Sequence, residues 1–125
     1  LGGGLADRYG ALPVMAATYL VQAAVLLGFP ALVQGLASLY LAAALLGWGF
    51  AVTLGLFPVL TAAQFGMRHF GANYGLVFTA FGAGAMAPLW TAWLHDVTGS
   101  LGVAFTAAGV LAALGLGLCA ALRQR

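Results

Sequence analysis

Charged side chains are almost absent from this chain. Only six of its 125 residues carry a charge, and 64% of the residues are hydrophobic. A soluble domain has about 25% charged residues. Too few polar side chains remain here to cover a water-facing surface, so the sequence predicts a membrane protein whose first partner is the lipid bilayer. The charged residues are Asp7, Arg8, Arg68, Asp96, Arg123 and Arg125.

The same composition excludes several other classes of protein. Four arginines and no lysine give a net charge of +2, which is no basic patch and predicts no nucleic-acid partner. The single cysteine, Cys119, allows neither an internal disulfide nor a cysteine-based metal site. A soluble enzyme, a secreted disulfide module and a disordered tail are therefore excluded.

The apolar residues fall into four runs. A bilayer core of about 30 Å needs about 20 mostly apolar helical residues. Dividing the sequence at its charges and turn formers predicts an all-α membrane protein with four transmembrane helices, preceded by a cytoplasmic loop over residues 1–11. Gly28 and Pro30 are expected to end the first span, and Asn73 and Ser100 to cap the last two. The region 12–125 contains the spans, at about 12–29, 36–63, 72–95 and 101–122.

The arginines predict an orientation. With four spans, both ends of the chain and the middle loop lie on one side of the membrane, and all four arginines fall on that side. The two opposite loops contain no basic residue. Because basic residues accumulate in cytoplasmic loops, both ends of the chain are predicted to be cytoplasmic.

Small residues recur every fourth position in two of the spans. Such stripes let helix backbones approach closely in lipid, so they are expected to be packing seams. The third span instead concentrates Gly82 and Gly84 before Pro88, and we identify these three residues as a candidate hinge, since interrupted helices line transporter sites. The stripes are Ala43, Gly47, Ala51 and Gly55 in the second span, and Gly109, Ala113, Gly117 and Ala121 in the fourth.

No catalytic constellation is found in the sequence. Neither His69 nor His95 has a carboxylate at ligand spacing, and Asp7 and Asp96 are predicted to lie on opposite membrane faces. The sequence therefore predicts no enzyme, no metal site and no cofactor. No charge falls at hydrocarbon depth either, so a carrier built on this chain holds the charge of its substrate on other helices or moves a weakly polar solute.

A short motif opens the chain. Residues 3–10 read Gly-Gly-Leu-Ala-Asp-Arg-Tyr-Gly and resemble the G-x-L-a-D-R-x-G loop signature of the major facilitator superfamily. The basic pair that usually follows is replaced by Ala11-Leu12, which is more typical of the second copy of the motif. Its key positions are Gly3, Asp7, Arg8 and Gly10, in a tight turn that can present the Asp7 carboxylate to the positive end of a neighbouring helix. The alternative is a simple charged anchor loop.

Two further matches extend the resemblance over the whole chain. Residues 65–82 are similar to the inner loop and eleventh helix of oxalate/formate antiporter-like carriers, which are relatives of the monocarboxylate transporters. Residues 95–100, with Ala104-Phe105 behind them, resemble the D-x-T-G-S…A-F turn before the final helix. The resemblance implies helices 9–12 of a twelve-helix carrier in a bacterial inner membrane. The chain is then expected to be a C-terminal fragment, in agreement with its start on Leu1, and its partners are the missing helices.

Departures from the family pattern narrow the expected substrate. Ala87-Pro88 stands where Gly-Pro is usual, which keeps the kink, and Leu101 stands at a position that is often aromatic. Oxalate carriers place a basic residue in the eleventh helix, and residues 73–95 contain none. This disfavours oxalate and leaves a monocarboxylate or an uncharged solute.

The function implied by the resemblance is secondary transport of a small solute, a small organic anion, by alternating access. The tenth and eleventh helices border the path in this family. The alternative for each candidate residue there, and the more common case, is a packed aromatic or a threonine bonded to its own helix. Two alternatives remain: a small four-helix membrane protein acting as an oligomeric carrier, or a non-transporting membrane scaffold subunit. The candidate path-lining residues are Trp48, Thr53, Phe57, Tyr74, Phe78 and Thr79.

Overall fold

The computed structural model describes residues 2–123, which are helical apart from short connections. The described residues contain no strand. The helices are α1 (Gly2–Tyr9), α2 (Ala11–Leu27), α3 (Phe29–Leu32), α4 (Leu36–Phe65), α5 (Phe70–Gly84), α6 (Ala87–Thr98) and α7 (Leu101–Arg123).

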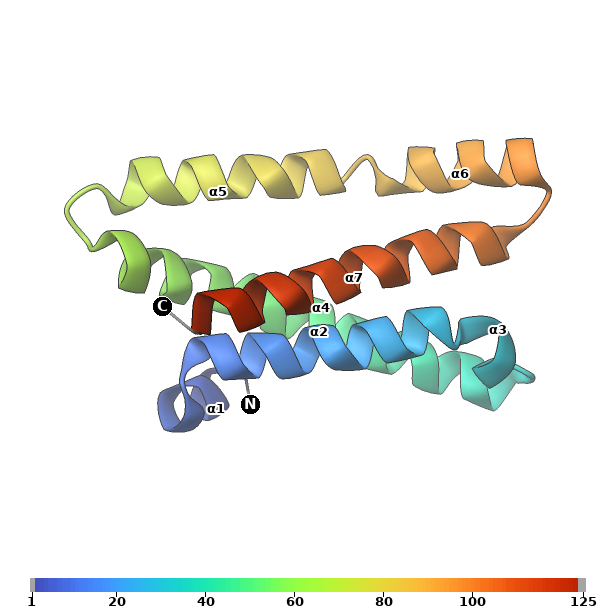
Figure 1. Ribbon diagram of the computed structural model, residues 1–125, viewed down its shortest axis with the longest axis horizontal. Helices are drawn as coiled ribbons and strands as arrows, with labels where there is room; N and C mark the ends of the chain where they lie inside the picture. Colours follow the sequence, from blue (N-terminus) through green and yellow to red (C-terminus); the bar gives the residue numbers. More distant parts are fainter. Residues whose placement is uncertain (1, 124–125) are drawn as a thin grey trace.

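The long helices run up and down as four rods (Figure 1). The first rod is α2 continued by α3, the second is α4, the third is α5 followed end to end by α6, and the fourth is α7. The helix α1, the α4–α5 turn and the last turn of α7 lie at one end of the bundle. The helix α3 and the α6–α7 turn lie at the other.

Three of the rods are long and apolar enough to cross a membrane: Leu36–Phe65, Leu101–Leu122, and Phe70–Thr98 across α5 and α6. The helix α2 is apolar but has 17 residues, which at about 1.5 Å per residue is shorter than a bilayer core of about 30 Å. It ends at Leu27 with Gly28 as its C-cap, and Pro30 just beyond has no N–H to offer to the Leu26 carbonyl.

Local signals fixed some helix ends and not others. Ser100 caps α7 as expected, since its hydroxyl oxygen accepts the Gly102 N–H at 3.1 Å. Asn73 does not cap α5, which begins three residues earlier at Phe70. The Asn73 N–H already donates to the His69 carbonyl at 3.0 Å, so Asn73 belongs to the first turn of the helix.

The segment expected to be a loop over residues 1–11 forms the helix α1 instead. The reversal of direction falls on Gly10 alone, whose φ of 90° is in the region that favours glycine. Asp7 is exposed in the last part of α1, and no side chain caps the following helix α2. In the described part of the chain the Asp7 carboxylate therefore caps no helix.

The core lies where α2 packs between α7 and α4. Leu56, which is 2% exposed, contacts Met15, Val52 and Cys119 in one buried cluster. At Gly109 the backbones of α7 and α2 come so close that an added Cβ would lie 2.7 Å from the Leu27 side chain. By contrast, no residue of α5 or α6 is buried.

The small-residue stripes are seams only in part. Gly109 is buried against α2, but the other three members of its stripe are exposed. All four stripe residues of α4 are exposed, so they pack against no helix in the described part of the chain. A different face of α4 packs against α2. On this face Gly49, and not Gly47, meets the Gln22 side chain. That face carries Ala42, Gly49, Val52 and Leu56.

Candidate functional site

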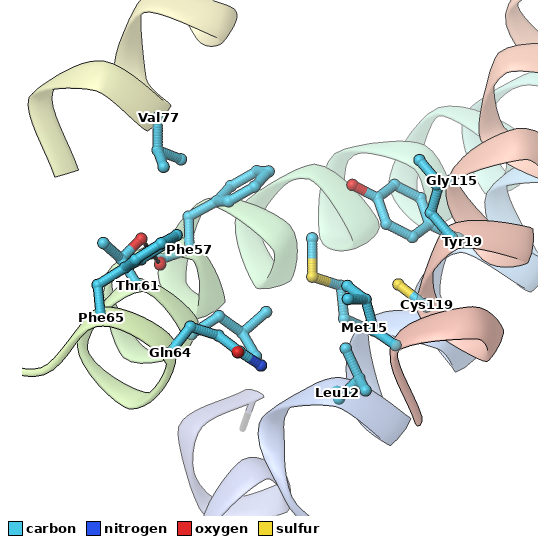
Figure 2. A pocket seen from close by; sticks show the side chains of 13 residues that line it. Leu12, Met15, Tyr19, Phe57, Thr61, Gln64, Phe65, Val77, Gly115 and Cys119 are labelled. Atoms are coloured by element: carbon cyan, nitrogen blue, oxygen red, sulfur yellow. Dashed lines mark hydrogen bonds between the residues drawn. The ribbon is translucent and has the colours of Figure 1, made fainter. Parts of the chain in front are cut away.

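The first cavity opens between α2, α4 and α7, with Val77 of α5 on its far side (Figure 2). Its volume is about 260 Å³. It lies toward the end of the bundle that carries α1, because it reaches the first residues of α2 and the last turns of α4 and α7. Its lining residues are Leu12, Met15, Tyr19, Phe57, Leu60, Thr61, Gln64, Phe65, Val77, Gly115, Leu118, Cys119 and Leu122.

This first cavity has few polar groups and no charged one. The Thr61 hydroxyl is already used, since it donates to the Phe57 carbonyl of its own helix at 2.8 Å. The Gln64 side chain extends toward Met15, with its amide group at the edge of the cavity (Figure 2). Tyr19 and Cys119 supply the remaining polar atoms. The cavity therefore offers neutral hydrogen-bonding groups only.

The second cavity, of about 230 Å³, lies between α4 and α5. Phe57 and Val77 line both the first and the second cavity, so the two cavities are adjacent. Three of the candidate path-lining residues, Phe57, Tyr74 and Phe78, line it together. The full lining is Leu54, Phe57, Tyr74, Val77, Phe78, Ala80, Phe81 and Gly84.

A row of aromatic rings runs along this second cavity. Ring centroids are 5.5 Å apart between Phe70 and Tyr74, 5.7 Å between Tyr74 and Phe78, and 5.1 Å between Phe78 and Phe81. Phe50 of α4 continues the row, 5.9 Å from Phe81. The sequence analysis missed Phe81 and Phe50. The α5 aromatics follow one another at intervals of three and four residues, which already places Phe81 on the same helix face as Tyr74 and Phe78.

The other three candidate path-lining residues lie elsewhere or are already bonded. The Thr53 hydroxyl donates to the Gly49 carbonyl at 2.8 Å, and the Thr79 hydroxyl donates to the Leu76 carbonyl at 2.6 Å. Trp48 lines a third cavity, of about 330 Å³, with Tyr9 and residues of α2. None of the three lines the second cavity with Phe57, Tyr74 and Phe78.

The candidate hinge coincides with an interruption of the third rod at Ala85 and Met86. The helix tightens there, since the Met86 N–H donates to the Ala83 carbonyl, three residues back, at 3.2 Å. Pro88 is the second residue of α6 and has no N–H to offer to the carbonyl of Gly84. Gly84 also lines the second cavity, so the interruption and the aromatic row meet.

The charged residues lie at the two ends of the rods. Arg8 and Arg68 belong to α1 and the α4–α5 turn, at the end where α7 finishes on Arg123 (Figure 1). Arg125 lies outside the described residues. Asp96 is near the opposite end, with its Oδ1 3.8 Å from Nδ1 of His95. No group of three metal-ligating side chains occurs among residues that the structure describes.

The motif residues Asp7, Arg8 and Gly10 are exposed at the arginine-bearing end, and Gly3 lies in the first turns of α1. Asp7, Arg8 and Gly10 line none of the three cavities described above. Comparisons with known protein families, with curated proteins and with solved structures found no match to this chain.

Proposed function

We propose that this chain is the C-terminal, membrane-embedded part of a secondary transporter that moves a small organic anion by alternating access. The observation that carries the proposal is an aromatic-lined cavity beside an interrupted apolar helix. Interrupted backbone at membrane depth is tolerated where it is buried in protein or lines a cavity. Secondary transporters commonly place their substrate sites at such discontinuous helices.

Uncovered helix faces support the view that further helices complete the carrier. The rod of α5 and α6 has no buried residue, and the α4 stripe from Ala43 to Gly55 is exposed. Small residues on a lipid-exposed stripe allow close helix contact, which is the main source of association between membrane helices. The resemblance to helices 9–12 of major facilitator carriers assigns these faces to the remaining helices.

The ends of the rods support an orientation for the proposed carrier. Arg8, Arg68 and the end of α7 share one end of the bundle, which the positive-inside rule assigns to the cytoplasm of a bacterial inner membrane. In this arrangement α1, which packs on both α2 and α4, is a cytoplasmic latch. The interruption at Ala85 and Met86 is the flexing point of the third rod.

The mass of the native polypeptide tests the proposal. An antibody to residues 64–73 should detect, in source membranes, a band at roughly three times the 12.6 kDa of this chain, as twelve helices require. Vesicles containing that polypeptide should then take up labelled formate, oxalate or lactate. A band at 12.6 kDa would overturn the large carrier. Uptake by the small protein would then indicate an oligomeric carrier, and no uptake a scaffold subunit.

A further inference from the structure

The second cavity, between α4 and α5, has a lining that restricts what it can hold. Its walls are aromatic and aliphatic, and the Tyr74 hydroxyl is the only polar side-chain group among them. Phe57 faces it from α4, while Phe78 and Phe81 contribute stacked rings from α5. At about 230 Å³ it is smaller than the roughly 300–1,000 Å³ of pockets for drug-sized ligands, so its volume suits a compound with a single ring.

The absence of charge among these lining side chains argues against a dianion such as oxalate. Burying a charged group without a charged or well hydrogen-bonded partner is costly, and the cost rises with each further charge. A monoanion with a large apolar body is different, because burial of the body offsets the desolvation of one carboxylate. Aromatic rings gain additionally from offset or tilted contacts with other rings at centroid distances of about 4.5–7 Å.

We propose, resting on the function proposed above, that this second cavity selects small aromatic monocarboxylates. The ring of the substrate packs between Phe57 of α4 and the Phe78 and Phe81 rings of α5. The carboxylate accepts a hydrogen bond from the Tyr74 hydroxyl. Aliphatic monocarboxylates such as lactate enter the same cavity but gain less, because they lack a ring to place against the aromatic row.

Uptake measurements on the native polypeptide in proteoliposomes test this selectivity. The probes are labelled benzoate, lactate, formate and oxalate, each corrected for leakage into protein-free liposomes. We expect KM for benzoate to be about tenfold below KM for lactate, the ratio that ring burial and ring contacts supply. Phe78→Ala should raise KM for benzoate about tenfold and leave KM for lactate within about twofold. Phe78→Leu, which keeps bulk, should shift the same ratio by less.

A matched control separates ring recognition from general damage. Phe105→Ala makes the same chemical change where Phe105 stacks on Phe29 at 4.0 Å, far from the second cavity in the fold. It should leave the benzoate-to-lactate ratio unchanged. Transport of lactate or formate without benzoate, or equal effects of Phe78→Ala and Phe78→Leu on both substrates, would overturn the selectivity and leave the carrier in place. No uptake of any probe would overturn the proposed carrier function.

Discussion

Leu56 is the large apolar side chain most fully enclosed in the described bundle, at 2% exposure between Met15, Val52 and Cys119. Leu56→Ala should lower the free energy of unfolding in detergent by about 2 kcal/mol, near the low end of the range for buried leucines. The low end applies because a leucine released to lipid or detergent tails regains an apolar environment, and only its packing is lost.

Denaturation with increasing sodium dodecyl sulfate, followed by circular dichroism, measures this change. Leu41→Ala is the matched control, since Leu41 lies in the same helix but is 64% exposed. We expect the control to change the free energy of unfolding by less than about 0.5 kcal/mol. Equal losses for the two variants would mean that the Leu56 cluster is not the core of the bundle.

The Asp7 carboxylate bears on the proposed latch. It lies three residues before Gly10, which begins the uncapped N-terminus of α2. The carboxylate caps no described helix, so it acts on α2 only through the helix dipole, an effect of about 1 kcal/mol at most. Asp7→Asn should therefore slow the initial rate of solute uptake about two- to fivefold without reducing the amount of protein in the membrane. Asp7→Glu should keep most of the rate, and an unchanged rate in Asp7→Asn would remove Asp7 from the latch.

At the scale of elements, the contact between α2 and α7 depends on Gly109. An added Cβ at Gly109 would lie 2.7 Å from Leu27 side-chain atoms and 3.1 Å from the Leu27 backbone nitrogen, so the helices must separate. Gly109→Ala should cost about 1–3 kcal/mol of unfolding free energy. Gly117→Ala in the same helix meets nothing within 4 Å and should be neutral or slightly stabilising in this chain. Thermal unfolding in detergent would contradict this prediction if the two variants behaved alike.

The interruption between α5 and α6 should respond to Pro88. Pro88→Ala restores an N–H that can donate to the Gly84 carbonyl, so the two helices can join into one. We expect the amides of residues 84–87 to exchange with solvent at least about tenfold more slowly than in the native chain, as measured by hydrogen–deuterium exchange. Pro58→Ala is the control, because Pro58 lies inside the continuous helix α4. Unchanged exchange in Pro88→Ala would mean that other residues maintain the interruption.

The sequence predicted features that depend on neighbours along the chain. The end of α2 at Gly28 and the cap of α7 at Ser100 were correct because each is a local hydrogen-bonding effect. Phe57, Tyr74 and Phe78, three of the six candidate path-lining residues, line one cavity, and their role as a site stays a prediction. The inward face of α4 was not predictable, because a helix that is apolar on all sides has no periodic pattern to mark its packed face. On that face Gly49 meets Gln22 of α2, a contact across the fold.

At the scale of the whole molecule, the bundle is packed on one side only. Its buried residues are contributed by α2, α4 and α7, whereas the described parts of α5 and α6 contribute none. The second cavity, which carries the proposed function, lies between the packed helix α4 and the uncovered helix α5. A rod with no buried side chain can move relative to its neighbours at small cost, which suits the moving element of a carrier.

The short helix α2 decides whether the chain crosses the membrane three or four times. It has 17 residues, but it packs between α4 and α7, both long enough to span, and together with α3 it runs along most of the length of α7 (Figure 1). If α4 and α7 cross a membrane, we expect a helix packed between them to cross with them. We therefore expect Gly4 and Gln34, which precede and follow α2 and α3, to lie on opposite sides.

Gly4→Cys and Gln34→Cys, treated with a membrane-impermeant maleimide in right-side-out and inverted vesicles, measure this arrangement. Both positions are exposed, and an added Cβ at Gly4 meets nothing within 4 Å. The native Cys119 is 6% exposed and should remain unlabelled, which the unsubstituted chain controls. We expect Gly4→Cys to react only in inverted vesicles and Gln34→Cys only in right-side-out vesicles. Labelling of both cysteines from the same side would mean that α2 does not cross the membrane. The number of crossings would then be odd, and the proposed orientation, which needs an even number, would be wrong.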